Sequence, residues 1–300
     1  GKRNKVADLK IGQTDFEKDI LRQDILLEAK LTCIELIYFN KNKLLLKSRS
    51  ESMKTLLDLF QLKMDKGEGN ILDVNKAKIN LLNSKSELMV LENNINELNQ
   101  KLTELNGGNR IIFNDTLYPV IPVIPDFANL EHIIEEADPH RKSIVQEKLI
   151  YQSQVELSKS LSLPKFELGY YYLGLTNQNF NGIHLGFSLP LWENNYRSDF
   201  YRSKSLSSDL DLESHDNEHY YEIKKLYDRY EVLKNVLNEY QLTLESINSE
   251  TLLSNALNLG EISILEYFVE LSFYYSSADK YKELEMEYNK VVAEMFKFKL

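Results

Sequence analysis

The chain has 300 residues, of which 27% are charged and 43% hydrophobic, and its formal net charge is −10. This negative charge comes without a dense Lys/Arg cluster, so nucleic acid is not expected among the partners, because phosphate contact needs a basic face. Six Pro and eleven Gly are few for this length, which favours long uninterrupted helices, and the single Cys33 excludes a disulfide within the chain.

The first predicted element is one helix from about Phe16 to Met64, roughly 70 Å long. Its predicted packing seam, apolar except for one serine, recurs at helical spacing: Leu27, Leu31, Ile34, Tyr38, Leu45, Ser52, Leu59 and Leu62. A second apolar line flanks the first: Leu46, Met53, Leu57, Phe60 and Met64. Two lines predict neighbouring helices on both sides, as in a ring or sheet of helices. After a turn at 66–69 the chain returns as a helix over Ile71–Leu105, which gives an antiparallel helical hairpin.

The next stretch breaks the helical pattern. Residues 106–109, Asn-Gly-Gly-Asn, end the second helix, and residues 110–129 carry three prolines among alternating Val and Ile. An extended linker with at most short edge strands is expected there. A short helix is predicted from Leu130 to Ala137, and Asp138-Pro139 begins another that runs to about Leu161.

Residues 164–192 have the period-two pattern of a β-hairpin around a polar loop at 176–182. Apolar side chains fall on one face of each strand: Phe166, Leu168, Tyr170 and Tyr172, then Ile183, Leu185, Phe187, Leu189 and Leu191. Transmembrane strands have this pattern and this length, and Tyr170, Tyr171, Tyr172 and Trp192 could be interfacial aromatics. A soluble amphipathic hairpin that covers a core is the alternative.

A helix is predicted again from about Arg197 to Gly260, with an unbroken seam from Ile223 to Thr251. The chain then turns back as a further helix that runs to Leu300, which gives a second helical hairpin. This half repeats the first at an offset of 193 residues, because residues 67–73 correspond to 260–266. The apolar stripe that follows the turn repeats as well. Val74, Leu81, Leu88, Leu91, Ile95, Leu98, Leu102 and Leu105 correspond to Tyr267, Tyr274, Tyr281, Leu284, Tyr288, Val291, Met295 and Phe298. The period is too long for a solenoid unit and indicates an internal duplication.

Each copy of the turn has the residues of a helix end followed by a helix start. A glycine ends one helix, Asn70 or Ser263 caps the next, and an acid follows three positions later, Asp73 or Glu266. We expect these acids to act as capping residues beside the positive helix end.

Taken together, the features resemble the TolC family, the outer-membrane factors of efflux and type I secretion. The resemblance rests on the repeated turn, on Leu163-Pro164 before a hairpin that leaves through residues 188–192, and on the helix start at 138–141, about 25 residues earlier. It implies a mainly α-helical fold of long antiparallel coiled-coil hairpins that form an α-barrel tunnel, plus strands of a transmembrane β-barrel. The implied domains are a first-repeat helical hairpin (1–105), an equatorial linker (106–139), a helix leading to the barrel (140–163), a transmembrane β-hairpin (164–192) and a second-repeat helical hairpin (193–300).

The resemblance further implies a homotrimer in the bacterial outer membrane that extends into the periplasm. It would contact outer-membrane lipid, a periplasmic adaptor and an inner-membrane transporter, as a passive export conduit without catalysis, cofactor or metal. Glu266 and Asp73 would be acids of the tunnel entrance, while Gly67, Gly69, Asn70, Gly260 and Ser263 would form the adaptor-docking tips. The repeat places Gly1 just after the position of a first β-hairpin, so an N-terminally incomplete chain is expected.

Two other function classes compete. A structural coiled-coil scaffold explains the helices but neither the hairpin nor the duplication. A zinc metallopeptidase is suggested by His215-x-x-Glu218-His219, which fits the inverted zincin pattern H-x-x-E-H. No third-ligand motif follows it, and its surroundings are strongly polar, which favours a solvated helix face. His132, His140 and His184 share no ligand spacing with one another.

Overall fold

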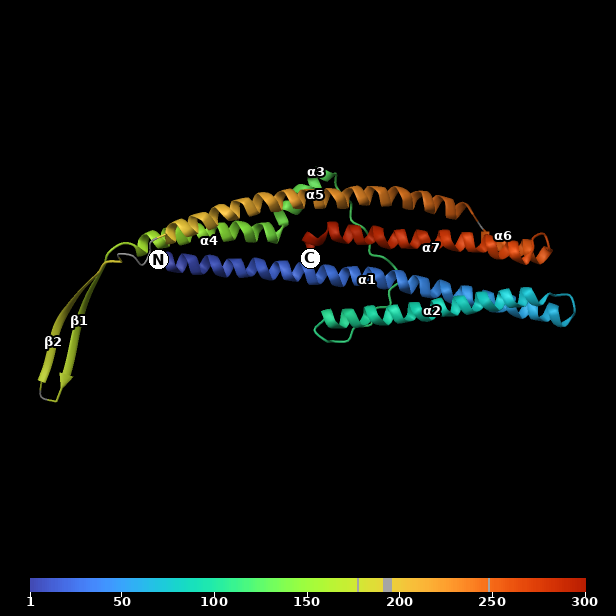
Figure 1. The fold of residues 1–300 in the computed structure, drawn as a ribbon, viewed down its shortest axis with the longest axis horizontal. Helices are drawn as coiled ribbons and strands as arrows, with labels where there is room; N and C mark the ends of the chain where they lie inside the picture. The colour runs from blue at the N-terminus through green and yellow to red at the C-terminus, as the bar shows by residue number, and fades with distance from the viewer. Residues whose placement is uncertain (177, 191–195, 248) are drawn as a thin grey trace. The chain divides into compact units, whose positions relative to one another are not determined.

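A computed structural model describes residues 1–176, 178–190, 196–247 and 249–300. In chain order the elements are α1 (Lys2–Asp65), α2 (Ile71–Leu105), α3 (Phe127–Ala137), α4 (Pro139–Leu161), β1 (Lys165–Leu175), β2 (Gln178–Ser188), α5 (Arg197–Ser246), α6 (Ser249–Leu259), α7 (Ile264–Met295) and the 3₁₀ turn η1 (Lys297–Lys299) (Figure 1). The expected fold class, mainly helical with one antiparallel β-hairpin, is confirmed. No helix among the described residues combines the length and apolar character needed to cross a membrane.

The chain divides into two units, one of residues 1–22 with 128–222 and the other of residues 23–127 with 223–300. In the first unit α4 packs against both the beginning of α1 and the beginning of α5. The Gln146 side chain donates to the backbone carbonyl of Leu9 at 2.7 Å, and Lys148 forms an ion pair with Asp209. Helix α1 therefore begins at Lys2 rather than at Phe16, because these polar contacts and the burial of Val6 hold a stretch whose apolar residues are too few to predict a helix.

In the second unit α1 is flanked by α2 on one side and α7 on the other (Figure 1). One cluster joins α1 to α2 through Leu36, Leu91, Ile95 and Leu102. Near the turn, Met53 packs on α7 and Phe60 packs on α2. The prediction of neighbours on both sides is thus confirmed. The expected seam is wrong beyond Leu45, however, because Ser52, Leu59 and Leu62 are exposed while the second line is buried or half-buried.

Three ion pairs hold α1 and α7 antiparallel, and a fourth joins α1 to the turn η1 that follows α7. Both terminal nitrogens of Arg49 donate to the Asp279 carboxylate, at 2.8 and 2.9 Å, and the guanidinium lies 3.8 Å from the centre of the Tyr275 ring. Towards the start of α1 the ladder continues through Lys41–Glu285, Glu35–Lys290 and Asp24–Lys297, at 2.5–2.6 Å. Along this ladder of ion pairs, residue numbers rise on α1 while they fall on the partner side. The ion pairs therefore fix the antiparallel register between the two repeats.

The segment between α2 and α3 contains no helix or strand over residues 107–126, as expected, although α3 begins three residues earlier than predicted. Its backbone is tied to the helices by side-chain amides. Asn40 donates to the carbonyls of Phe113 and Asp115, and Asn99 accepts from the Phe113 N–H at 2.9 Å. The segment is therefore anchored without forming regular structure itself.

The two strands pair antiparallel, with Phe166 opposite Phe187, Leu168 opposite Leu185 and Tyr170 opposite Ile183. These six residues therefore share one face, as expected, whereas the predicted apolar position Leu191 lies outside the described residues. The opposite face pairs small residues with large ones, because Gly186 faces Glu167 and Gly182 faces Tyr171.

The prediction of one unbroken helix from about Arg197 to Gly260 is wrong, because α5 ends at Ser246 and α6 begins at Ser249. At the end of α5 the Ser246 hydroxyl donates to the Thr243 carbonyl at 2.7 Å, and the Ile247 N–H bonds three residues back rather than four. Such bonds compete with the α-helical pattern. The corresponding residues of the first repeat, 53–56, lie in the continuous helix α1.

We predict that the ion pair of the buried Arg49 contributes more to the free energy of unfolding than the exposed ion pair of Lys297. Arg49 is 9% exposed and makes two charge-assisted hydrogen bonds, so Arg49→Met should lower the free energy of unfolding by about 2 kcal/mol. Lys297→Met removes an exposed rung and should cost less than about 1 kcal/mol. Urea unfolding followed by far-UV circular dichroism measures both, and equal effects would contradict the prediction.

Candidate functional site

The two helical-hairpin tips have the same backbone geometry. In the first, Gly67 has φ +75°, its N–H bonds to the Met64 carbonyl, and the Glu68 N–H bonds to the Lys63 carbonyl. In the second, Gly260 has φ +72°, and the equivalent N–H groups, of Gly260 and Glu261, bond to the carbonyls of Leu257 and Ala256. Each tip is therefore a Schellman motif with glycine in the left-handed region, and the duplication extends to individual hydrogen bonds.

The first tip is closed by Gly69 and Asn70. A Cβ on Gly69 would lie 2.6 Å from the backbone nitrogen of Met64, so no side chain fits there without a shift. The Asn70 side chain accepts from the Leu72 N–H at 2.9 Å and begins α2. Asp73 follows in the first turn of α2, half-buried.

The second tip has the complete capping box. The Ser263 hydroxyl accepts from the Glu266 N–H at 3.2 Å, and the Glu266 carboxylate accepts from the Ser263 N–H at 2.7 Å. These bonds to the charged form lower the pKa of Glu266. The capping role expected for Glu266 is therefore present, and its carboxylate remains exposed at the tip.

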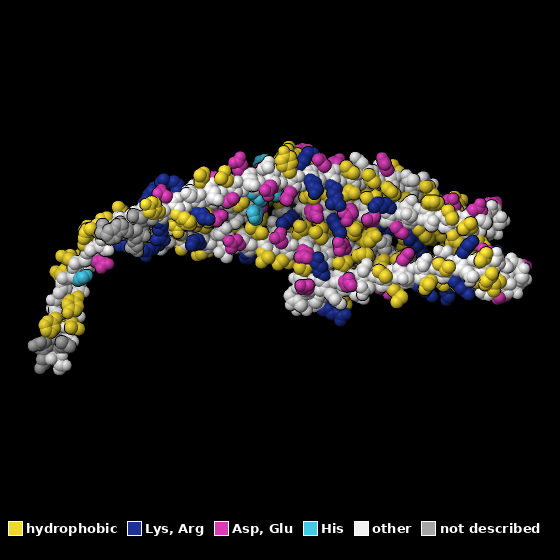
Figure 2. Space-filling model, viewed as in Figure 1, with side chains coloured by type: hydrophobic (Ala, Val, Ile, Leu, Met, Phe, Trp, Pro, Cys, Tyr) yellow, Lys and Arg dark blue, Asp and Glu magenta, His cyan; other side chains and the backbone are white. Residues whose placement is uncertain are grey.

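The apolar face of the β-hairpin is exposed. Phe166, Leu168, Ile183 and Leu185 are each 76–79% exposed, and hydrophobic side chains line the hairpin in Figure 2. Tyr170 shares this face, whereas Tyr171 belongs to the opposite one. The expected interfacial role of Trp192 lies outside the described residues. A face of this kind needs a partner or an apolar environment.

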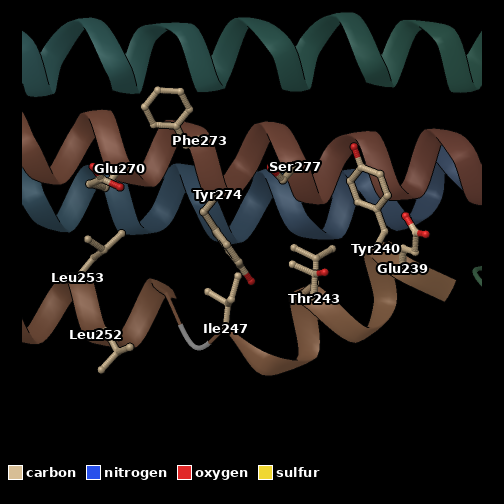
Figure 3. Close-up of a pocket in the computed structure, with 11 residues that line it drawn as sticks. Glu239, Tyr240, Thr243, Ile247, Leu252, Leu253, Glu270, Phe273, Tyr274 and Ser277 are labelled. Carbon is tan, nitrogen blue, oxygen red and sulfur yellow. The ribbon is translucent and has the colours of Figure 1, made fainter. Parts of the chain in front are cut away.

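A pocket of about 570 Å³ in the second unit lies among α5, α6 and α7 and was not foreseen from the sequence. Figure 3 shows Tyr274 projecting from α7 towards Ile247 at the end of α5. Leu244 and Leu253 complete an apolar wall, and among the described lining residues there is neither His nor Cys. The pocket lies beside the end of α5 and the start of α6, and its lining also includes Glu239 and Glu270.

The histidine motif on α5 meets a carboxylate from another element. Nε2 of His215 lies 2.6 Å from Oδ2 of Asp138, and the ligand atoms of Asp138, His215 and His219 lie within 4.8 Å of one another. Burial opposes the ionisation of Asp138, but the hydrogen bonds from His215 and the His140 N–H outweigh it, and the pKa of Asp138 is lowered. Sequence spacing could not reveal this third group, because Asp138 precedes His215 by 77 residues.

Glu218, the acid of the same motif, is exposed and accepts from the Ser214 hydroxyl at 3.2 Å. The ring of His140 lies over that of His215, with centroids 4.7 Å apart. His132 instead faces Glu136 one turn along α3. The structure thus brings His140 beside His215 and His219, which the sequence spacing did not indicate, whereas the i,i+4 spacing of His215 and His219 already placed those two together.

No known family profile matches the sequence, and no curated protein is significantly similar to it. Several solved structures match over nearly the whole chain. The CmeC outer membrane channel of Campylobacter jejuni is 15% identical with a TM-score of 0.74, over 99% of this chain and 66% of that one. The outer membrane protein VceC of Vibrio cholerae is 14% identical with a TM-score of 0.78, over 98% of this chain and 74% of that one.

The MtrE outer membrane channel of Neisseria gonorrhoeae, in its open state, is 10% identical with a TM-score of 0.68 and is matched over 99% of this chain and 70% of that one. The present chain therefore spans two thirds to three quarters of the length of these proteins. With its duplicated helical hairpins, paired tips and single β-hairpin, the chain has the TolC-like fold of outer-membrane channel proteins.

Proposed function

We propose that this chain is the subunit of a trimeric export channel that crosses the bacterial outer membrane and extends into the periplasm, as the passive conduit of a tripartite efflux pump or type I secretion system. The observation that carries the proposal is the exposed apolar face of the β-hairpin, attached to a fold otherwise made of long helices. The helical hairpins would wall the tunnel, and β1 and β2 would lie in lipid.

Lipid is the environment that best fits this face. Each strand has 11 residues, about the number that crosses a bilayer when tilted. Leaving a Leu or Phe side chain in water forfeits about 1.5–3 kcal/mol relative to burial, and the face carries several of them. A coiled-coil scaffold has no use for such a strand pair, so the hairpin favours the channel over the scaffold.

Further copies of the chain would complete the tunnel wall. Helix α2 packs on α1 with one stripe but exposes a second one, 59–71% exposed, at Leu72, Ile79, Leu82, Met89 and Val90. These positions recur at helical spacing, which is typical of a helix with a neighbour on each side. A neighbouring subunit in a closed ring would cover this stripe, since a single chain leaves it open to solvent.

The tips would form the periplasmic end. Gly67, Gly69 and Asn70 in one tip, and Gly260 and Ser263 in the other, present the same backbone turn twice, so an adaptor protein could dock on both in one manner. Asp73 and Glu266 stand one turn inside these tips, where copies in a ring would place like charges around the entrance. Such a conduit works by width and charge and requires no catalytic residue.

We predict that the membrane contact depends on one face of the hairpin. Leu185→Arg puts a charge on the apolar face and should weaken insertion by about 2–4 kcal/mol if the site is near the bilayer centre. His184→Arg, one residue away on the opposite face, should have little effect. Flotation of the purified protein with phosphatidylcholine vesicles measures the insertion. A wild-type protein that remains in the soluble fraction would support the scaffold instead.

A second prediction separates the charge of Glu266 from its capping role. Glu266→Gln retains a side chain that can cap α7 but removes the charge, whereas Ser263→Ala removes half of the capping box and retains the charge. If Glu266 lines the entrance, Glu266→Gln should raise the concentration of a multivalent cation needed to block single-channel current by several-fold, and Ser263→Ala should not. An unchanged block in Glu266→Gln argues against an entrance role.

A further inference from the structure

We propose that Asp138, His215 and His219 bind one divalent transition-metal ion, of which Zn²⁺ is the model case, and that the ion fastens the start of α4 to α5. This inference concerns the first unit only and does not rest on the channel function. It assigns a role to the histidine motif that neither a passive conduit nor a peptidase requires.

The fold places the three groups independently of any metal. Asp138 is held as the N-cap of α4, where its carboxylate accepts from the backbone N–H groups of His140 and Arg141, at 2.8 and 3.2 Å. His215 and His219 lie one turn apart on α5 with their rings stacked, centroids 5.3 Å apart. Two neighbouring elements thus bring two imidazoles and one carboxylate together, with ligand atoms within 4.8 Å.

The donor set and its dimensions suit zinc. Zn–N and Zn–O bonds of about 2.0–2.1 Å in a tetrahedron put ligand atoms about 3.3 Å apart. His215 Nε2 and Asp138 Oδ2, now 2.6 Å apart, would separate slightly, and His219 would move inward. The ion would take the place of the hydrogen that now bridges His215 and Asp138, and this hydrogen would move to Nδ1 or to solvent.

The residues around the three ligands favour the binding of a cation. Asp138 is 8% exposed, so its carboxylate is shielded from water and its orientation is fixed by the backbone donors, as outer-shell hydrogen bonds fix metal ligands elsewhere. His215 also borders a pocket of about 420 Å³ whose lining includes Glu147, Asp211 and Glu218. Of the three proposed ligands only His215 lines this acidic pocket, which would attract a cation to the His215 side of the site.

A hydrogen-bonded pair without metal is the competing interpretation. The His215–Asp138 bond and the two bonds from Arg141 to Asp216, at 2.8 and 3.3 Å, already join α4 to α5. They do not account for His219, which has the same spacing from His215 that metal-binding pairs have and lies beside the same carboxylate. The experiment must therefore ask whether His219 and the carboxylate charge matter for metal.

The test uses the whole protein without a polyhistidine tag, freed of metal by chelation and titrated with Zn²⁺ against a chromophoric chelator. Wild type should bind one ion per chain. His219→Asn and Asp138→Asn should each lower the affinity by about tenfold or more. Asn is a good N-cap, so Asp138→Asn removes the ligand charge while keeping the start of α4.

His132→Asn is the matched control, because it removes one exposed imidazole outside the cluster and should leave zinc binding unchanged. At the same Zn²⁺ concentration, the ion should raise the Tm of wild type and of His132→Asn by more than that of His219→Asn. Circular dichroism spectra check that each variant is folded. The proposal is overturned if wild type binds no zinc, or if folded His219→Asn binds it as tightly as His132→Asn does.

Discussion

The antiparallel ladder between α1 and α7 is the contact on which the second unit depends. These helices belong to different repeats, and ion pairs join them at three points, with a fourth from α1 to the turn η1 after α7. Apolar clusters supply the packing energy, but heptad-like stripes can slide by a turn with little change in burial, whereas Arg49 fits only Asp279 and the face of Tyr275. With α1 and α7 fixed, α2 packs on the other side of α1, and the two tips follow as the places where each helical hairpin turns back.

Much of this arrangement could be predicted from the sequence, because it depends on residues that are close together in the chain. The bounds of α2 follow from an N-cap at Asn70 and the glycines after Leu105, and each is decided by residues within one turn. The β-hairpin follows from strict alternation, which the register confirms. The full second stripe, from Tyr267 to Phe298, is buried or half-buried as expected. In each case the signal and the structure span the same few residues.

The features that escaped prediction depend on partners distant in sequence. Helix α1 extends back to Lys2 because α4, more than a hundred residues later, supplies hydrogen-bond partners. The end of α5 at Ser246 depends on side-chain bonds that compete with a pattern still periodic in apolar residues. Asp138 joins His215 and His219 only through the packing of α4 on α5. The spacing of histidines along one helix can indicate metal ligands on that helix, but it cannot indicate a carboxylate that another element contributes.

The order of charges along the ladder also discriminates among partners. On α1 the acids Asp24 and Glu35 come before the bases Lys41 and Arg49, and along α7 and η1 the acids likewise come first. Two copies of α1 laid side by side in the same direction would set acid against acid and base against base. The residues that hold the native antiparallel pair therefore also disfavour parallel self-association of α1, a mode in which long amphipathic helices often pair.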